Sequence, residues 1–171
     1  FMGLSDGARI DIFRHSNHGN LVNDQVVAFT QIDKEKWNDL LNELRKDTKD
    51  TSAKFSDLYV IDDFTASGTT LLRKNGDKWK GKLFKLYSSI SDFGEMNEIF
   101  DDGWTLHVHH YLMSESVIPK LKAKQSQALK DMGKDNWFNN VEFTYSVLLP
   151  SSLALDTIRD KEFLALADNY Y

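Results

Sequence analysis

The sequence predicts a single α/β domain in which a mostly parallel sheet is flanked by helices. Candidate strands and helices alternate along the chain, which is the order expected when helical crossovers join parallel strands. Residues 58–61 form a short, continuous apolar run (Leu-Tyr-Val-Ile), which is typical of a parallel strand buried on both faces. The 171 residues are 41% hydrophobic and 27% charged, so the chain is large and apolar enough to form one hydrophobic core.

The first half of the chain contains one strongly periodic helix and several shorter segments. Asp33 is placed to cap this helix. Its apolar side chains recur at i, i+3, i+4 and i+7, and these are Trp37, Leu40, Leu41 and Leu44. The other predicted elements are, in chain order, a strand tail at residues 1–4, a turn with Ser5 or Asp6 as the N-cap of a short helix at 8–13, a loop at 15–20, a strand at 25–30 and a charged surface loop at 46–56.

The second half repeats the alternation of strands and helices. After the strand at 58–61, we expect a helix to begin at Leu71, followed by a polar excursion over residues 75–82. The later predicted elements are a strand at 104–113, a helix at 116–132 that ends at Gly133, and a strand at 141–149 that stops at Pro150.

Charge and composition limit the class of partner. The net charge of -5 argues against broad nucleic-acid binding but leaves room for a local cationic pocket. The chain has no cysteine, which excludes disulfides and thiolate metal sites and fits a cytoplasmic protein. No apolar run approaches the roughly 20 residues of a membrane helix. Because the chain begins at Phe1 and is already hydrophobic there, we expect a fragment of a longer chain.

Residues 60–70 (Val-Ile-Asp-Asp-Phe-Thr-Ala-Ser-Gly-Thr-Thr) carry the strongest chemical signal. Asp62 and Asp63 follow the buried strand, and open α/β sheets bind ligands at the carboxyl ends of their strands. Neighbouring carboxylates at that place can accept hydrogen bonds from the two hydroxyls of a ribose, or hold a hydrated magnesium ion. A solvated acidic turn is the plainer interpretation, and the loop that follows argues against it.

The loop after the two acids offers a site for an anion. Its members are Ala66, Ser67, Gly68, Thr69 and Thr70. Consecutive backbone N–H groups at a helix N-terminus bind phosphate, the hydroxyls add donors, and a glycine lets the backbone approach closely. The same residues would also cap a helix, and that role is compatible with phosphate binding.

Together, the strand, the paired acids and the glycine loop resemble the 5-phosphoribosyl-1-pyrophosphate (PRPP) signature of the type I phosphoribosyltransferases. The resemblance covers about eleven residues of the chain. It implies a phosphoribosyltransferase-like α/β fold, with Asp62 and Asp63 as catalytic residues that hold the ribose hydroxyls and, through water, Mg²⁺. The residues implied to bind the 5-phosphate are Ala66, Ser67, Gly68, Thr69 and Thr70. The implied reaction transfers the phosphoribosyl group to a nitrogen nucleophile and releases pyrophosphate.

Two weaker parts of the resemblance lie near the N-terminus. The loop that would bind pyrophosphate comprises Ser5, Asp6, Gly7 and Arg9, for which a plain turn and cap is the alternative. Residues 21–27 stand roughly where the family has a mobile loop over its active site. The candidate cations for the departing pyrophosphate are Arg9, Lys80, Lys82 and Lys85, and solvated surface side chains are the alternative for the lysines.

The chain also departs from the family. Purine-type members usually carry an acid at the position of Ala66, where it serves as a general base, and orotate-type members usually carry a hydroxyl residue there. The hood that recognises the base is expected either in the tail at residues 151–171 or upstream of the chain.

Three hypotheses about function therefore stay open. The first is an enzyme that transfers a phosphoribosyl group from PRPP with Mg²⁺, and the second is a non-catalytic module that binds PRPP or a nucleotide and regulates a partner domain. The third is a metal-dependent hydrolase built on His107 and His109, which share one face of a strand without an evident third ligand. Structural histidines are the plainer interpretation, and a homodimer is a further expectation from the family.

Overall fold

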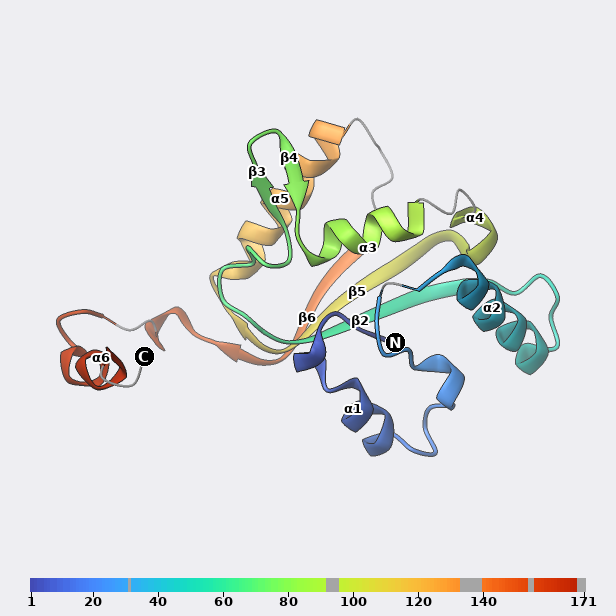
Figure 1. Ribbon diagram of the computed structural model, residues 1–171, viewed down its shortest axis with the longest axis horizontal. Coiled ribbons are helices and arrows are strands. Elements are labelled where there is room, and N and C mark those ends of the chain that lie inside the picture. Colours follow the sequence, from blue (N-terminus) through green and yellow to red (C-terminus); the bar gives the residue numbers. More distant parts are fainter. Residues whose placement is uncertain (31, 92–95, 133–139, 154–155, 169–171) are drawn as a thin grey trace.

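Four parallel strands form the central sheet of the protein (Figure 1). The structure is a computed structural model that describes residues 1–30, 32–91, 96–132, 140–153 and 156–168. In spatial order the strands are β1 (Met2–Gly3), β2 (Phe55–Thr65), β5 (Phe100–Ser114) and β6 (Asn140–Leu149). All three strand pairs are parallel. The predicted α/β class with a mostly parallel sheet is confirmed, and each carboxyl end lies at the same edge.

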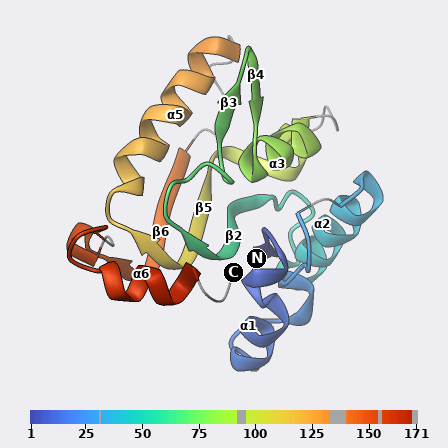
Figure 2. The same ribbon diagram turned by 60° about the vertical axis from the view of Figure 1, so that its left-hand side comes forward.

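Helices α3 (Lys82–Ser91) and α5 (Val117–Met132) cover one face of the sheet, and α1 (Ile10–Ser16) lies on the opposite side (Figures 1 and 2). The core lies under α3 and α5. Its fully buried members include Val60, Leu71, Leu86, Ile90, Leu106, Val108 and Leu121. Burial of each large aliphatic side chain contributes about 2 kcal/mol, so this layer is the main source of stability.

Helix α2 (Lys34–Thr48) confirms the periodic helix predicted from the sequence. A side-chain oxygen of Asp33 accepts a hydrogen bond from the backbone N–H of Lys36 at 2.8 Å, which is the predicted N-cap. The buried Trp37 ring meets Phe55 and Phe100 edge-on, with ring centroids 6.4 and 5.5 Å away. Because Phe55 and Phe100 begin β2 and β5, this contact fixes α2 at the amino ends of the strands, away from the edge where a ligand is expected.

The N-terminal region differs from the prediction in two places. Residues 25–30 do not form a strand, because only Val27 bridges to Met2 and a 3-10 helix, η2 (Asn23–Gln25), precedes it. The expected helix at 8–13 is a 3-10 turn, η1 (Asp6–Ala8), followed by α1, which includes His15 from the predicted loop. The left-handed conformation of Arg9 (φ 45°) separates η1 from α1, so the two cannot join into one helix.

The prediction that a helix begins at Leu71 is wrong. Instead, a turn leads into an antiparallel hairpin of β3 (Arg73–Asn75) and β4 (Lys78–Lys80), and the helix begins only at Lys82. The reason is local: Gly76 supplies a positive φ of 59° at the tip of a two-residue hairpin turn. Hydrogen bonds from Lys82 N to Thr70 O (3.0 Å) and from Leu83 N to Leu71 O (3.1 Å) close the base of the hairpin.

The remaining elements are short. They are α4 (Met96–Ile99), the 3-10 turn η3 (Ser151–Leu153) and α6 (Lys161–Asp168). The tail that carries η3 and α6 leaves the carboxyl end of β6 and extends away from the sheet (Figure 1). Gly133, the expected end of α5, lies outside the described residues. Among the helices that the structure describes, none is long and apolar enough to cross a membrane.

We expect Gly81→Ala to destabilise the protein more than Gly76→Ala. Both glycines have positive φ (124° and 59°), but a Cβ on Gly81 would lie 2.3 Å from Leu71 O, whereas nothing lies within 4 Å of a Cβ on Gly76. The expected losses of unfolding free energy are about 2 kcal/mol or more for Gly81→Ala and about 1 kcal/mol for Gly76→Ala. Urea denaturation measures both, and equal losses would contradict the close packing at the base of the hairpin.

Candidate functional site

Asp62, near the carboxyl end of β2, is buried and holds three elements together. Ser5, in the loop after β1, donates its hydroxyl hydrogen bond to Oδ1 of Asp62, and the ammonium group of Lys82, at the start of α3, donates to Oδ2. The carboxylate is only 2% exposed. The structure therefore joins positions 5, 62 and 82, which the sequence separates widely, at one edge of the sheet.

The protonation of Asp62 follows from these partners. Burial by itself would raise the pKa of Asp62, because it disfavours a charged group. The hydrogen bonds from Lys82 and Ser5 and the positive charge of Lys82 outweigh burial, so the net pKa lies below its ordinary value. Asp62 is therefore a carboxylate at neutral pH, and both of its oxygens are engaged by protein groups.

Asp63 has a different environment from Asp62. Its side chain is exposed, and its Oδ1 accepts a hydrogen bond from the backbone N–H of Phe64 at 2.8 Å. A Cβ on Gly7 would lie 2.4 Å from Oδ2 of Asp63, so the loop after β1 closely approaches this carboxylate. Of the two predicted acids, Asp63 is the one that solvent and a ligand can reach.

The predicted phosphate loop lies directly after β2. Ser67 Oγ and Thr69 Oγ1 are hydrogen-bonded at 2.8 Å, and Arg73 Nη1 donates to Thr69 O at 3.1 Å. Within the described residues, the backbone N–H groups of Ser67, Gly68 and Thr70 donate to no protein acceptor. These three amides of one short loop are therefore open to an acceptor from outside the protein, such as an anion.

Gly68 is required for packing as well as for the loop conformation. Its φ is 68°, and a Cβ would lie 2.7 Å from Leu121 Cδ2 on α5. The loop does not open a helix of its own, as the sequence suggested, because the hairpin intervenes. Thr70 O nevertheless accepts the first helical N–H of α3, so the N-terminus of α3 lies beside the loop.

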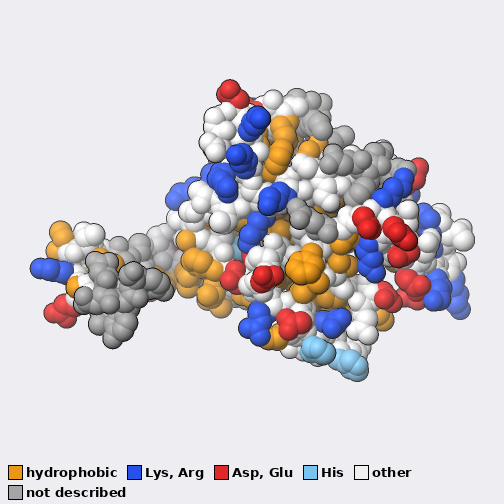
Figure 3. All heavy atoms as spheres, in the orientation of Figure 1, with side chains coloured by type: hydrophobic (Ala, Val, Ile, Leu, Met, Phe, Trp, Pro, Cys, Tyr) orange, Lys and Arg blue, Asp and Glu red, His pale blue; other side chains and the backbone are white. Residues whose placement is uncertain are grey.

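Two hollows border the N-terminus of α3, and Lys82 and Lys85 line both of them. The smaller hollow, of about 470 Å³, also includes Gly3, Leu4, Phe29 and Thr30. The larger one, of about 730 Å³, lies under the β3–β4 hairpin and is called the hairpin hollow here. Figure 3 shows basic side chains gathered on the surface in the region of the hairpin and α3.

Only part of the predicted pyrophosphate loop lies against Asp62 and Asp63. Ser5 and Gly7 contact Asp62 and Asp63, as described above, whereas Asp6 and Arg9 are exposed. The loop is anchored from the sheet, because Tyr111 on β5 donates to Ala8 O at 2.8 Å. Of the other candidate cations, Lys80 and Lys85 are exposed and line the hairpin hollow.

His110 is a buried neighbour of Asp62 that the sequence interpretation missed. It pairs with Asp62 in the β2–β5 register and is 0% exposed, and neither ring nitrogen has a hydrogen-bond partner among the described residues. Burial is the largest cause of its lowered pKa, about 4. A signal was present: His110 continues the alternation of Trp104, Leu106 and Val108, so the same face of the strand was expected to be buried.

His107 and His109 share the other face of β5, as predicted, and both rings are satisfied by protein groups. His107 Nε2 lies 2.8 Å from Asp57 Oδ1 and its Nδ1 lies 3.2 Å from Glu142 Oε2. His109 contacts the hydroxyls of Thr144 (2.9 Å) and Ser146 (3.0 Å). In the part of the chain that the structure describes, no group of three metal-ligating side chains occurs.

Comparisons with protein families, with curated proteins and with solved structures found no match to this chain.

His110 is expected to make stability depend on pH. Its pKa is lowered from 6.5 to about 4 in the folded protein, so the unfolded chain binds the proton first as the pH falls. The contribution of His110 to the free energy of unfolding is complete above pH 6.5. It declines by about 3 kcal/mol as the pH falls from 6.5 to 4. We expect His110→Gln to flatten this decline in urea denaturation series.

The control is His18→Gln, which removes an exposed histidine and is expected to leave the decline in place. An unchanged pH dependence in His110→Gln would show that the imidazole is not held neutral by burial.

Proposed function

We propose that this chain is a phosphoribosyltransferase-type domain that binds PRPP at the carboxyl ends of β1 and β2. The single observation that carries the proposal is the hydrogen bond from Ser5 to Asp62. It joins the loop after β1 to the acids at the end of β2, and the phosphate loop follows those acids directly. An acid for a sugar diol, amides for a phosphate and a second loop for a pyrophosphate are thus side by side.

The proposed roles follow from accessibility. Asp63 accepts hydrogen bonds from the ribose hydroxyls, because its carboxylate is exposed, while Asp62 positions Lys82 and the loop after β1. The backbone N–H groups of Ser67, Gly68 and Thr70 donate to the 5-phosphate, assisted by hydroxyl groups of the same loop. Lys82, whose side chain is 30% exposed, and Lys85 face the pyrophosphate.

Magnesium fits this arrangement through Asp63. Mg²⁺ prefers oxygen ligands and is usually held by one or two carboxylates together with substrate phosphates, with waters completing its shell. Asp62 is a poorer candidate, because Ser5 and Lys82 already engage its two oxygens. A magnesium ion bound there would neutralise charge on the pyrophosphate as it leaves.

The proposed reaction is displacement at the anomeric carbon. A nitrogen nucleophile forms a bond to C1 of the ribose, the bond from C1 to the pyrophosphate oxygen breaks, and its electron pair leaves with the pyrophosphate. Charge from Lys82 and Lys85 stabilises that developing anion. The proton of the nucleophile must go to another acceptor, because Ala66 cannot take it.

A second candidate is a module that binds PRPP or a nucleotide without catalysis. The observation that favours it is Ala66, an exposed residue without an acid or a base at the place where related enzymes carry a functional group. Such a module would regulate a partner domain or a second copy of the chain.

Isothermal titration of PRPP with Mg²⁺ tests the ribose-phosphate site. We expect Asp63→Asn to weaken binding about 10-fold or more, because it removes charge-assisted hydrogen bonds to the ribose. Thr70→Val is expected to weaken binding less, since only one hydroxyl donor is lost. Pyrophosphate release in the presence of candidate nitrogen bases then separates the enzyme from the binding module.

The matched control is Lys36→Gln, an exposed residue of α2 whose loss is expected to leave PRPP affinity unchanged. Asp62→Asn is a poor substitute for Asp63→Asn, because it removes the partner of Lys82 as well. Absence of PRPP binding by the wild-type chain would refute the phosphoribosyltransferase proposal, and absence of binding to PRPP and to nucleotides would refute both candidate functions.

A further inference from the structure

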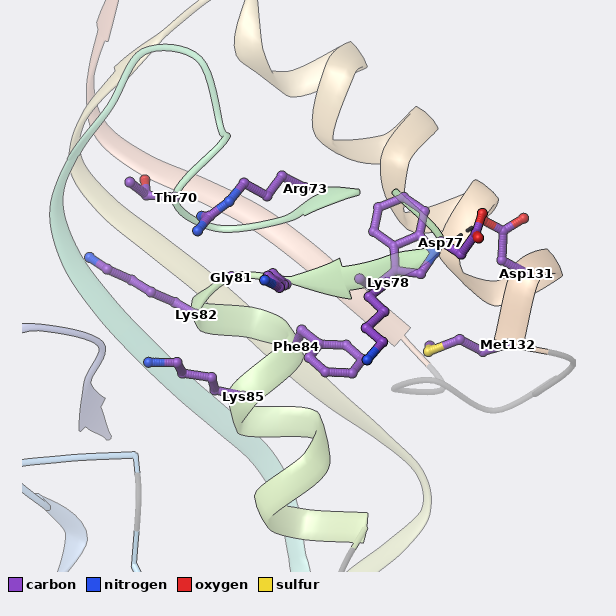
Figure 4. Close-up of a pocket in the computed structure, with 12 residues that line it drawn as sticks. Thr70, Arg73, Asp77, Lys78, Gly81, Lys82, Phe84, Lys85, Asp131 and Met132 are labelled. Carbon is purple, nitrogen blue, oxygen red and sulfur yellow. Dashed lines mark hydrogen bonds between the residues drawn. The ribbon is translucent and has the colours of Figure 1, made fainter. Parts of the chain in front are cut away.

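The hairpin hollow has the size of a small-molecule site. Its volume of about 730 Å³ lies within the ~300–1,000 Å³ that ligand pockets commonly have. Its walls come from β3, β4, α3 and the last turn of α5 (Figure 4). The hairpin is inserted between the phosphate loop and α3, and the lining of this hollow includes neither Asp62 nor Asp63, so the hollow is separate from the acids proposed above for the ribose.

One end of the hairpin hollow is cationic. In Figure 4 the side chains of Arg73, Lys82 and Lys85 extend toward the side on which Thr70 lies. Arg73 already donates to Thr69 O, and Lys82 to Asp62, so both are held in place by protein acceptors. Lys85 is exposed, and Lys80 on β4 adds a further ammonium group to the lining. This end is suited to phosphate groups.

The other end carries the apolar side chains of the lining, together with Lys78 and Asp131. Phe84, on the same helix as Lys82 and Lys85, points the opposite way, toward Met132 at the end of α5 (Figure 4). Trp79, on β4, also lines the hollow. Its Nε1 donates a hydrogen bond to Asp131 Oδ2 at 3.1 Å, which fixes the indole ring. An aromatic ring can pack against such a surface. Lys78 also lines the hollow and can lie over a bound ring.

The acids of the lining do not cancel this charge. Asp131 is paired with Lys74 at 2.7 Å and accepts hydrogen bonds from Gln127 and Trp79, which lowers its pKa and compensates its negative charge. Asp77 is exposed at the tip of the hairpin. The charge of Lys82 is compensated by Asp62, and the other lining cations are Arg73, Lys78, Lys80 and Lys85. Four cations against Asp77 leave the lining positive.

We infer that the hairpin hollow binds a nucleoside phosphate, with the phosphates at the end near Thr70 and the base between Trp79, Phe84 and Met132. One ligand that carries both an aromatic ring and phosphates matches the two ends of one continuous hollow. The inference goes beyond the proposed function, because it concerns a second ligand that makes no use of Asp63. The two sites share Thr70, Lys82 and Lys85, so occupancy of one is expected to affect the other.

Isothermal titration with ADP, and with inorganic pyrophosphate as the probe without a base, tests this inference. Wild-type protein is expected to bind ADP at least 10-fold more tightly than pyrophosphate. Lys78→Glu and Lys80→Glu should each weaken ADP binding about 10-fold, since each reverses a charge in the lining. Phe84→Leu should reduce the preference for ADP over pyrophosphate. If Phe84→Leu fails to fold, the variants Lys78→Glu and Lys80→Glu still test the inference, because both lysines are exposed.

Two controls separate this site from its neighbour. Lys36→Glu makes the same charge change at an exposed position of α2, which lies at the amino ends of the strands, and is expected to leave ADP affinity unchanged. Asp63→Asn is expected to weaken PRPP binding and to spare ADP binding. Equal affinities for ADP and pyrophosphate, no ADP binding, or ADP binding insensitive to Lys78→Glu and Lys80→Glu would overturn the inference.

Discussion

The buried carboxylate of Asp62 is the interaction on which the functional edge of the sheet depends. Taking a charged group out of water costs several kcal/mol unless it is paired and hydrogen-bonded. Here Ser5 and Lys82 provide that compensation from two other elements. The loop after β1, the end of β2 and the start of α3 therefore hold their relative positions as a unit. The neighbouring imidazole of His110 is kept uncharged by burial, so it does not compete with Lys82 for this carboxylate.

The same arrangement gives the adjacent residues Asp62 and Asp63 different environments. Successive side chains of a strand point to opposite faces, so Asp62 enters the core side while Asp63 meets solvent and Gly7. An isolated pair of aspartates in a sequence suggests two equivalent ligands. In this fold one aspartate positions the cations and the other is free for a ligand, which gives the pair two distinct physical roles.

The β3–β4 hairpin changes what the phosphate loop can do. The hairpin separates the loop from the helix that the sequence predicted directly after it. The N-terminus of α3 reaches the loop only through Thr70 O, and the hairpin adds a basic wall and an apolar floor beside it. The hairpin hollow and the smaller hollow adjoin at the start of α3, where Lys82 and Lys85 line both.

The sequence by itself determined the mostly parallel sheet, through its alternation of strands and helices and the apolar run before Asp62, and it determined α2 with its Asp33 cap, through local periodicity and capping. It did not reveal the hairpin, although Asn75-Gly76 was a usable turn signal, nor α3, whose buried side chains recur as Leu83, Leu86, Tyr87 and Ile90. Only the tertiary structure decided that Asp62 is structural, that His110 lies beside it and that Gly68 packs on Leu121. Each of these depends on contacts between segments far apart in the chain, which no local pattern encodes.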